Sequence, residues 1–246
     1  KTLAYGLSVY NHCLKTIKLN NKNLTALIIT PTRELAMQVF NEFSWLFSKK
    51  SIKMSTAIGG MDIKREKNNF SKGINLLIGT PGRLNDHLRR KSIILNQLKS
   101  LVLDEADEML DLGFKQDLDE IIKQTSKETR IMMFSATIPN KIERLANKYQ
   151  KNPVRIEATN LNKAHSDIFY ETYFIKKHDI ENAIFNFIRY HDDKTILIFC
   201  STRNAVNHIY TRILNRGFSA VSLSGAFSQN ERFKALQSIK NNRCKI

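Results

Sequence analysis

Near the middle of the chain the sequence reads Leu101-Val102-Leu103-Asp104-Glu105-Ala106-Asp107, an apolar run that ends in carboxylates. This pattern predicts a buried strand whose end lies at the carboxyl edge of a parallel sheet, where such sheets bind ligands. Asp104 is then a candidate to hold Mg²⁺, which prefers carboxylate and phosphate oxygens. Glu105 is a candidate to orient or deprotonate the water that attacks a γ-phosphate. The alternative is that the acidic pair simply begins a helix, because carboxylates favour helix N-termini.

Short apolar segments alternate with amphipathic ones on both sides of this run. Apolar residues at helical spacing predict helices, and short β-branched runs predict strands. The expected strands are residues 24–30, 53–58, 75–79, 101–104, 131–134 and 154–157, and the expected helices are residues 33–49, 62–70, 83–90, 114–124 and 139–149. Strands that are apolar on both faces and alternate with helices indicate an α/β fold, in which helices cover a parallel sheet.

A polar segment without periodicity, residues 158–167, reads as a linker, and the alternation restarts after it. The second half is expected to contain strands at residues 169–175, 195–199 and 220–223 and helices at residues 179–190, 204–216 and 229–240. We therefore predict two α/β domains, residues 1–157 and residues 168–246. Both ends are expected to be cut. The chain begins with Lys1 rather than Met, and residues 243–246 read as the start of a strand, which leaves the second domain incomplete.

The charge of the chain points to an anionic partner. Its 246 residues include 39 Lys and Arg against 23 Asp and Glu, a formal net charge of +16, and nucleic acid is the first partner to consider. The alternative is basic charge spread over solvated faces. The 3 cysteines contain no CxxC pair, which excludes a disulfide framework and a thiolate zinc site and suits a reducing compartment. No apolar run approaches the roughly 18 residues of a membrane span.

Polar turns follow three of the predicted strands, and a parallel sheet would bring these turns to one edge. They contain Pro31, Thr32 and Arg33, then Gly59 and Gly60, then Thr80, Pro81, Gly82 and Arg83. Helix N-termini, hydroxyls and two arginines suit a sugar-phosphate backbone. Ordinary turn chemistry is the alternative, because Pro and Gly interrupt regular structure in most proteins.

Two shorter signals complete the set. Lys1-Thr2 matches the end of a P-loop, in which Lys binds the β- and γ-phosphates and the Thr hydroxyl binds Mg²⁺. The glycines of that loop are missing, so the pair counts only together with the later carboxylates. Ser135 and Thr137 follow another strand, where their hydroxyls can bond a neighbouring carboxylate such as Asp107 or cap the next helix.

In this order the motifs resemble those of the DEAD-box RNA helicases, a family named after the residues found here at positions 104–107. The resemblance covers essentially the whole chain, and residues 103–113 are most similar to bacterial members. In the second half, residues 197–203 and 229–232 resemble RNA-side motifs of that family. A single motif of this kind is weak, whereas this many in the family's order and spacing are specific.

The resemblance implies two RecA-like domains with parallel sheets covered by helices, which close over ATP and single-stranded RNA. It implies an enzyme, an ATP-dependent RNA helicase whose RNA-stimulated ATP hydrolysis drives local unwinding of short duplexes or remodelling of RNA–protein particles. The expected cofactors are ATP and Mg²⁺. The expected partner is RNA recognised by its backbone, with ribosomal or mRNA particles as further candidates and no membrane. The expected location is the cytoplasm.

The site residues that the resemblance implies fall into three groups. Glu105 and Asp104 are expected to be catalytic; Lys1, Thr2, Asp104 and Glu105 to bind ATP; and Asp104 and Thr2 to hold Mg²⁺ through ATP. Asp107, Ser135 and Thr137 are expected to couple hydrolysis to RNA. RNA binding is expected of Pro31, Thr32, Arg33, Gly59, Gly60, Thr80, Pro81, Gly82, Arg83, Thr202, Gln229 and Arg232.

The sequence also departs from the family pattern. The family's adenine-reading glutamine and P-loop glycines, expected before Lys1, are missing, as are the arginine-bearing motifs expected after Ile246. We therefore expect this chain by itself to hydrolyse ATP poorly, because such arginines stabilise the transition state of phosphoryl transfer. Ala226 stands where the family usually has an acidic residue.

Two other functions stay open from the sequence. One is a DNA helicase or translocase of the same superfamily, although such proteins usually lack this combination of turns around Thr32, Arg83 and Ser135. The other is an RNA-binding clamp that does not hydrolyse ATP. Arginines in the missing C-terminal motifs would favour the enzyme over the clamp.

Overall fold

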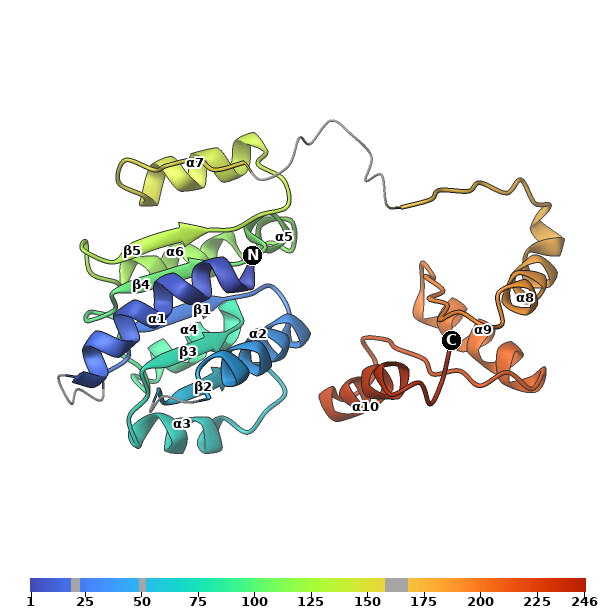
Figure 1. Cartoon of the computed structure of the whole chain (residues 1–246), viewed down its shortest axis with the longest axis horizontal. Helices are drawn as coiled ribbons and strands as arrows, with labels where there is room; N and C mark the ends of the chain where they lie inside the picture. Colours follow the sequence, from blue (N-terminus) through green and yellow to red (C-terminus); the bar gives the residue numbers. More distant parts are fainter. Residues whose placement is uncertain (19–22, 49–51, 158–167) are drawn as a thin grey trace. The chain divides into compact units, whose positions relative to one another are not determined.

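The computed structural model describes residues 1–18, 23–48, 52–157 and 168–246. The chain divides into two compact units, Lys1–Asn162 and Lys163–Ile246 (Figure 1). The predicted linker, residues 158–167, lies outside the described residues, so the domain boundaries at 157 and 168 stay a prediction. None of the helices described is both long and apolar enough to cross a membrane.

The first unit is built on a five-stranded sheet, and every pair of neighbouring strands is parallel. The strand order is β2-β3-β1-β4-β5. The strands are β1 (Ala26–Ile29), β2 (Met54–Ala57), β3 (Leu76–Gly79), β4 (Ser100–Leu103) and β5 (Arg130–Met133). The three central strands are buried along their whole length. The predicted parallel sheet is therefore confirmed in this unit.

Helices cover both faces of this sheet (Figure 1). They are α1 (Thr2–Lys18), α2 (Arg33–Leu46), α3 (Ile63–Ser71), α4 (Pro81–Arg89), α5 (Ala106–Asp111), α6 (Lys115–Lys123) and α7 (Asn140–Tyr149). Alternate strand residues point to opposite faces and enter two separate cores. Ile28 packs with α1 and α2, whereas Leu27 packs with side chains of α4, α6 and α7. Each face of the central strands is thus packed against helices, whereas β2 and β5 remain partly exposed.

The sequence did not predict α1 and α5. Helix α1 buries Tyr5, Val9 and Cys13, which recur every fourth residue, so a test for helical spacing at the N-terminus would have found it. Burial also raises the pKa of the Cys13 thiol to about 12, and all three cysteines are free. Helix α5 has 6 residues, too few for a periodic pattern to show.

The strand predicted at residues 154–157 is wrong. The segment is irregular, and Val154 and Ile156 are 84% and 83% exposed. A strand requires a neighbour to accept and donate its backbone hydrogen bonds. No strand in the described part of the chain pairs with this segment, so its β-branched composition is not sufficient.

The second unit contains the helices α8 (Ile180–Tyr190), preceded by the 3-10 turn η1 (Lys177–Asp179), α9 (Arg203–Asn215) and α10 (Gln229–Lys240). All three predicted helices are confirmed. Their small core contains Phe185, Ile188, Ile213 and Ala220.

The three strands predicted in this unit are wrong as regular strands, because residues 169–175, 195–199 and 220–223 are irregular. Two of these segments lie beside the last residues of the chain. Ile196 N donates to Lys245 O at 2.7 Å, and Val221 N donates to Ile246 O at 2.9 Å. Isolated hydrogen bonds do not form a ladder, so a strand is not established.

Candidate functional site

The carboxyl ends of the five strands meet at one edge of the first unit. The backbone pairing continues beyond the strands into the polar residues that follow them. Thr30 N donates to Gly79 O at 3.0 Å, Thr80 N to Ala57 O at 3.1 Å, and Asp104 N to Ile29 O at 2.9 Å. The sheet therefore fixes the backbone of the predicted site residues that directly follow a strand.

Asp104 is almost completely buried, with 3% of its surface exposed. Tyr5 Oη donates to Asp104 Oδ2 at 2.8 Å, and Glu105 N donates to Asp104 Oδ1 at 3.1 Å. Burial raises the pKa of Asp104, against the effect of the Tyr5 hydrogen bond. With one donor on each oxygen, the carboxylate has a fixed orientation.

Tyr5 is a site residue that the sequence did not reveal. Burial raises the pKa of its phenol, and the neighbouring charge of Asp104 raises it further. The Thr2 side chain also interacts with the Tyr5 hydroxyl. One turn of α1 thus links the predicted P-loop residue Thr2 to the predicted Mg²⁺ ligand Asp104. A tyrosine at a buried helical position gives no sequence signal of such a link.

Glu105 directly follows Asp104 and is the N-cap residue of α5. Its backbone has φ 52° and ψ 55°, the left-handed region that is strained for a residue other than glycine. This conformation directs its side chain to Lys1, whose Nζ lies 3.0 Å from both carboxylate oxygens. About a third of each side chain is exposed, so the pair remains open to solvent.

Asp107 joins the ends of β4 and β5. Its Oδ2 accepts hydrogen bonds from Thr137 N at 3.0 Å and Thr137 Oγ1 at 2.8 Å. Burial opposes ionisation of Asp107, but these hydrogen bonds outweigh it and lower its pKa. The Ser135 hydroxyl adds to this lowering, although its buried Oγ completes no hydrogen bond with the described residues. Of the predicted trio, Asp107 and Thr137 are therefore joined by hydrogen bonds, and Ser135 lies near them without completing one.

The oxygen donors at this edge suit Mg²⁺ only if substrate phosphates supply further ligands. Among the residues described, no group of three or more His, Cys, Asp or Glu side chains is placed to enclose a metal. Asp104 supplies one carboxylate, and the Tyr5 hydroxyl lies between it and the Thr2 side chain. Mg²⁺ is commonly held by one or two carboxylates together with substrate phosphates, and this donor set fits that mode.

The turn after β1 lies against the turn after β2. Thr32 caps α2, where its hydroxyl accepts from Leu35 N at 3.2 Å. The Arg33 guanidinium lies against Gly59, and a Cβ atom at Gly59 would be only 2.8 Å from Arg33 Nη2. Gly60 has φ 81°, which favours glycine. The two predicted RNA-binding turns are therefore packed together.

The turn after β3 begins α4. Thr80 is the N-cap residue and Pro81 occupies the first turn, where its missing N–H is no loss. Arg83 extends back over the turn after β2, where Nε donates to Glu66 Oε2 at 2.8 Å and Nη2 donates to Met61 O. Its side chain is only 12% exposed.

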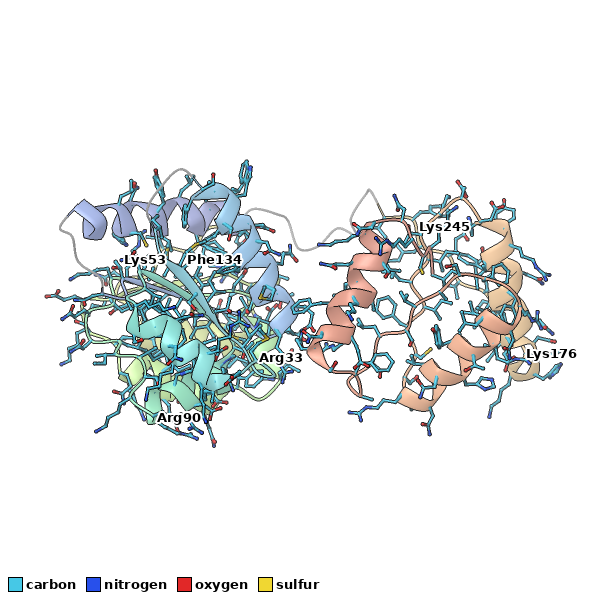
Figure 2. All side chains as sticks on the ribbon, turned by 90° about the horizontal axis from the view of Figure 1, so that it is seen from below. Arg33, Lys53, Arg90, Phe134, Lys176 and Lys245 are labelled. Atoms are coloured by element: carbon cyan, nitrogen blue, oxygen red, sulfur yellow. The ribbon has the colours of Figure 1, made fainter. Side chains whose placement is uncertain are left out.

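The predicted RNA-binding residues of the second unit lie at two helix N-termini. Thr202 caps α9 and accepts from Ala205 N at 3.1 Å. Gln229 begins α10 and is buried, and Arg232 lies in the same first turn. Exposed positive charge is present on both units, for example at Lys53 and Arg90 in the first and at Lys176 and Lys245 in the second, which Figure 2 labels.

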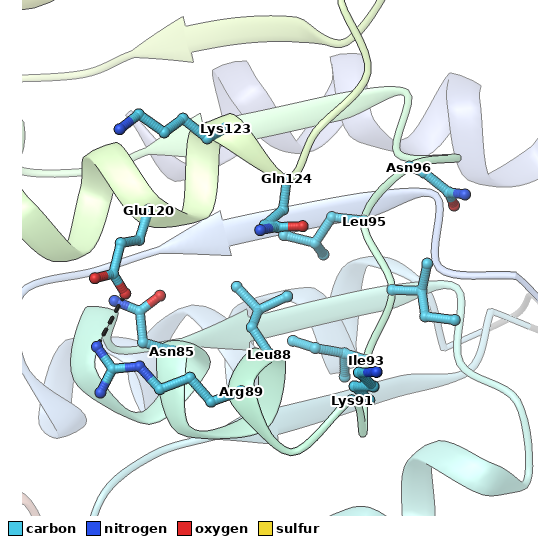
Figure 3. Close-up of a pocket in the computed structure, with 11 residues that line it drawn as sticks. Asn85, Leu88, Arg89, Lys91, Ile93, Leu95, Asn96, Glu120, Lys123 and Gln124 are labelled. Atoms are coloured by element: carbon cyan, nitrogen blue, oxygen red, sulfur yellow. Dashed lines mark hydrogen bonds and ion pairs between the residues drawn. The ribbon is translucent and has the colours of Figure 1, made fainter.

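A cavity of about 630 Å³ lies at the opposite edge of the first unit, between α4, α6 and the segment that leads into β4 (Figure 3). Its lining includes Leu88, Ile93 and Leu95, together with the ion pair of Arg89 and Glu120. None of the predicted site residues lines it. The sheet edge, rather than this cavity, is therefore the candidate site.

Two family models match the chain. Residues 1–145 match the DEAD/DEAH box helicase model, and residues 176–246 match the model of the helicase conserved C-terminal domain. The matches include the strand-end residues of the first unit and the helices of the second.

Among curated proteins, the chain is 35% identical over 250 residues to the ATP-dependent RNA helicase CshA of Limosilactobacillus reuteri, covering 100% of this chain and 49% of that protein. It is 35% identical over 242 residues to the DEAD-box ATP-dependent RNA helicase RhpA of Helicobacter pylori, covering 98% of this chain and 48% of that protein. The chain thus spans about half the length of these relatives.

Solved structures share the fold. A DEAD box protein from Methanococcus jannaschii is 33% identical, with a TM-score of 0.54 over 91% of this chain and 60% of that chain. Dbp5 of S. cerevisiae, solved with RNA and ADP BeF3, is 24% identical, with a TM-score of 0.85 over 100% of this chain and 61% of that chain. These similarities confirm the predicted RecA-like α/β fold class.

Proposed function

Because the chain belongs to the DEAD/DEAH box helicase family, we propose that the protein is an ATP-dependent RNA helicase. Its RNA-stimulated hydrolysis of ATP would drive local unwinding of short RNA duplexes or remodelling of RNA–protein particles. The observation that carries this proposal is the set of residues at the carboxyl edge of the sheet in the first unit. Asp104, Glu105 and Asp107 follow β4 at that edge, and the polar turns after β1, β2 and β3 lie at the same edge. This arrangement supports phosphate chemistry at the carboxylates and RNA binding at the turns.

We assign ATP binding to Lys1, Thr2, Asp104 and Glu105. Lys1 supplies the charge that binds the β- and γ-phosphates, and its present partner Glu105 then becomes free to orient the attacking water. Asp104 and Thr2 would hold Mg²⁺ against the phosphates. The ion, when bound, neutralises charge that develops on the phosphate oxygens.

We assign coupling between the nucleotide side and the RNA side to Asp107, Ser135 and Thr137. The two hydrogen bonds from Thr137 to Asp107 support this role, because they tie the segment after β5 to the first turn of α5, and that helix begins directly after Glu105. A change at Glu105 has a short covalent path to this bridge.

RNA binding is assigned to the turns at the same edge and to the two helix N-termini of the second unit. In the first unit these are Pro31, Thr32, Arg33, Gly59, Gly60, Thr80, Pro81, Gly82 and Arg83. In the second unit they are Thr202, Gln229 and Arg232. N-cap turns and an arginine such as Arg33 recognise phosphate and sugar, so the preference among sequences is expected to be weak. Ribosomal or mRNA particles as targets, and the cytoplasm as location, belong to the same proposal, which the three free thiols suit.

The test is ATP turnover by the full-length protein without nucleic acid, with single-stranded RNA, and with single-stranded DNA of the same sequence. We expect RNA, and not DNA, to stimulate turnover. Equal stimulation by DNA would favour a DNA translocase. Tight RNA binding without turnover would favour the clamp and remove Glu105 from its assigned role.

A further inference from the structure

A buried ionic cluster joins α3 to α4 behind the turn after β2. Glu66 of α3 receives two donors from one face of α4, Arg83 Nε at 2.8 Å and His87 Nε2 at 2.7 Å, both on Oε2. The side chains of Glu66, Arg83 and His87 are 8%, 12% and 0% exposed. The His87 ring packs edge-on against Phe70 of α3, with ring centroids 4.8 Å apart. A carboxylate so enclosed is retained only with such partners.

The cluster also holds the backbone of the turn that contains Gly59 and Gly60. Glu66 Oε1 accepts from Ile58 N at 3.1 Å, directly before the glycines. Arg83 Nη2 donates to Met61 O, directly after them. Hydrogen bonds to the cluster therefore fix the backbone on both sides of the two glycines, at Ile58 and at Met61. Without the cluster, a pair of glycines at this position would sample many conformations.

The orientation of Arg83 determines what this arginine can do. Its Nε is bonded to Glu66 and its Nη2 to Met61, and the side chain is almost enclosed. The same carboxylate offsets its positive charge. In this geometry Arg83 contributes to RNA binding through the turn that it holds.

Resting on the proposed function, we infer that Glu66, Arg83 and His87 form a positioning unit for the Gly59–Gly60 turn. Glu66 is a positioning residue for RNA binding, and Arg83 acts through the same turn without contacting a phosphate. Preorganising a binding loop improves affinity because the entropy of ordering it is lost before binding.

Glu66→Ala distinguishes positioning of the turn from direct contact between Arg83 and a phosphate, because the two predict opposite changes in RNA affinity. If Arg83 contacted a phosphate, removing Glu66 would release an arginine and delete a negative charge, and RNA would bind more tightly. The positioning role predicts the reverse. We expect affinity for a labelled single-stranded RNA, measured by anisotropy with a non-hydrolysable ATP analogue, to fall roughly 3- to 10-fold. Unchanged or tighter binding would overturn the inference.

The salt dependence of binding tests Arg83 itself. The plot of log K against log salt has a negative slope, and loss of one phosphate contact to a single strand reduces the magnitude of that slope by about 0.7. We expect Arg83→Ala to weaken binding while the slope stays that of the parent chain. A slope reduced by one contact would show that Arg83 touches a phosphate. The matched control is Glu120→Ala, which deletes one negative charge from the exposed ion pair with Arg89 of the same α4 helix and should leave RNA affinity unchanged.

Hydrogen exchange makes the test independent of RNA. Without nucleic acid, the amide of Ile58 should exchange faster in Glu66→Ala than in the parent or in Glu120→Ala. Glu66→Gln keeps the size and one oxygen acceptor, so its exchange and RNA affinity should lie between those of the parent and Glu66→Ala. If Glu66→Ala does not fold, Glu66→Gln carries both measurements. A parent chain that fails to bind RNA overturns the proposed function; a parent that binds, with affinity and exchange unaltered by either variant, overturns this inference alone.

Discussion

At the scale of single residues, hydroxyl groups decide how the carboxylates at the sheet edge are held. Asp104 depends on Tyr5, and Asp107 depends on Thr137. The second pair was anticipated from the sequence because both residues belong to recognisable motifs. The first was not, because a tyrosine at an apolar helical position looks like any core residue. Only the packing of α1 on the sheet brings its hydroxyl to Asp104.

We expect Tyr5→Phe to lower the free energy of unfolding by about 1–3 kcal/mol, because it removes a buried hydrogen bond to a carboxylate and leaves the ring in place. Chemical denaturation would measure the change. Tyr10→Phe is the control, since Tyr10 lies on the same helix and stacks on Phe47 through its ring. Equal effects of the two substitutions would show that the Tyr5 hydroxyl does not stabilise Asp104.

Thr137→Val should raise the pKa of Asp107 towards the ordinary value of about 4, because one of its donors disappears. The lowered pKa in the folded state means that ionised Asp107 stabilises the fold above that ordinary value, and that this stability is lost as the pH falls through the folded-state pKa. Between neutral and acid pH, the free energy of unfolding should therefore fall less in the variant than in the parent. Titration of the Asp107 carboxyl by NMR measures the shift, and an unaltered pKa would contradict the assignment.

At the scale of elements, periodicity predicted most helices to within a few residues because a helix satisfies its own hydrogen bonds. Strands depend on neighbours. The buried strands of the first unit were predicted, since apolar runs between helices leave little alternative. Residues 154–157 and the three extended segments of the second unit have similar composition but form no ladder with any described segment. Composition alone does not contain that information.

The close approach of β2 and β3 gives an element-scale prediction. A Cβ atom at Gly79 would lie 2.6 Å from Ala57 O in the neighbouring strand, so Gly79→Ala should destabilise the protein by about 1–3 kcal/mol. Gly82 in α4 has no atom within 4 Å of such a Cβ. Gly82→Ala should therefore stabilise the helix by about 0.5–1 kcal/mol. Thermal unfolding of both variants compares the signs, and stabilisation by Gly79→Ala would show that the strands can move apart.

At the scale of the whole molecule, we expect the net charge of +16 and the polar turns at the sheet edge of the first unit both to favour RNA binding. Binding of single-stranded RNA should weaken steeply as salt rises, with a slope of about −0.7 for each phosphate neutralised. Different RNA sequences of equal length should show similar affinities, because the contacts are to the backbone. A series of affinities at increasing salt, repeated with two unrelated sequences, measures both. Salt-independent binding would mean that the charge is spread over solvated faces.

The measurement that tests the account most directly compares the full-length protein with its Glu105→Gln variant. Two quantities are measured on the same samples: ATP turnover in the presence of single-stranded RNA, and the affinity of the protein for that RNA with and without ATP. We predict that Glu105→Gln abolishes RNA-stimulated turnover, because no carboxylate remains to orient the water, while ATP still promotes RNA binding. Retained turnover in Glu105→Gln would contradict the central claim that the carboxylates after β4 perform the hydrolysis.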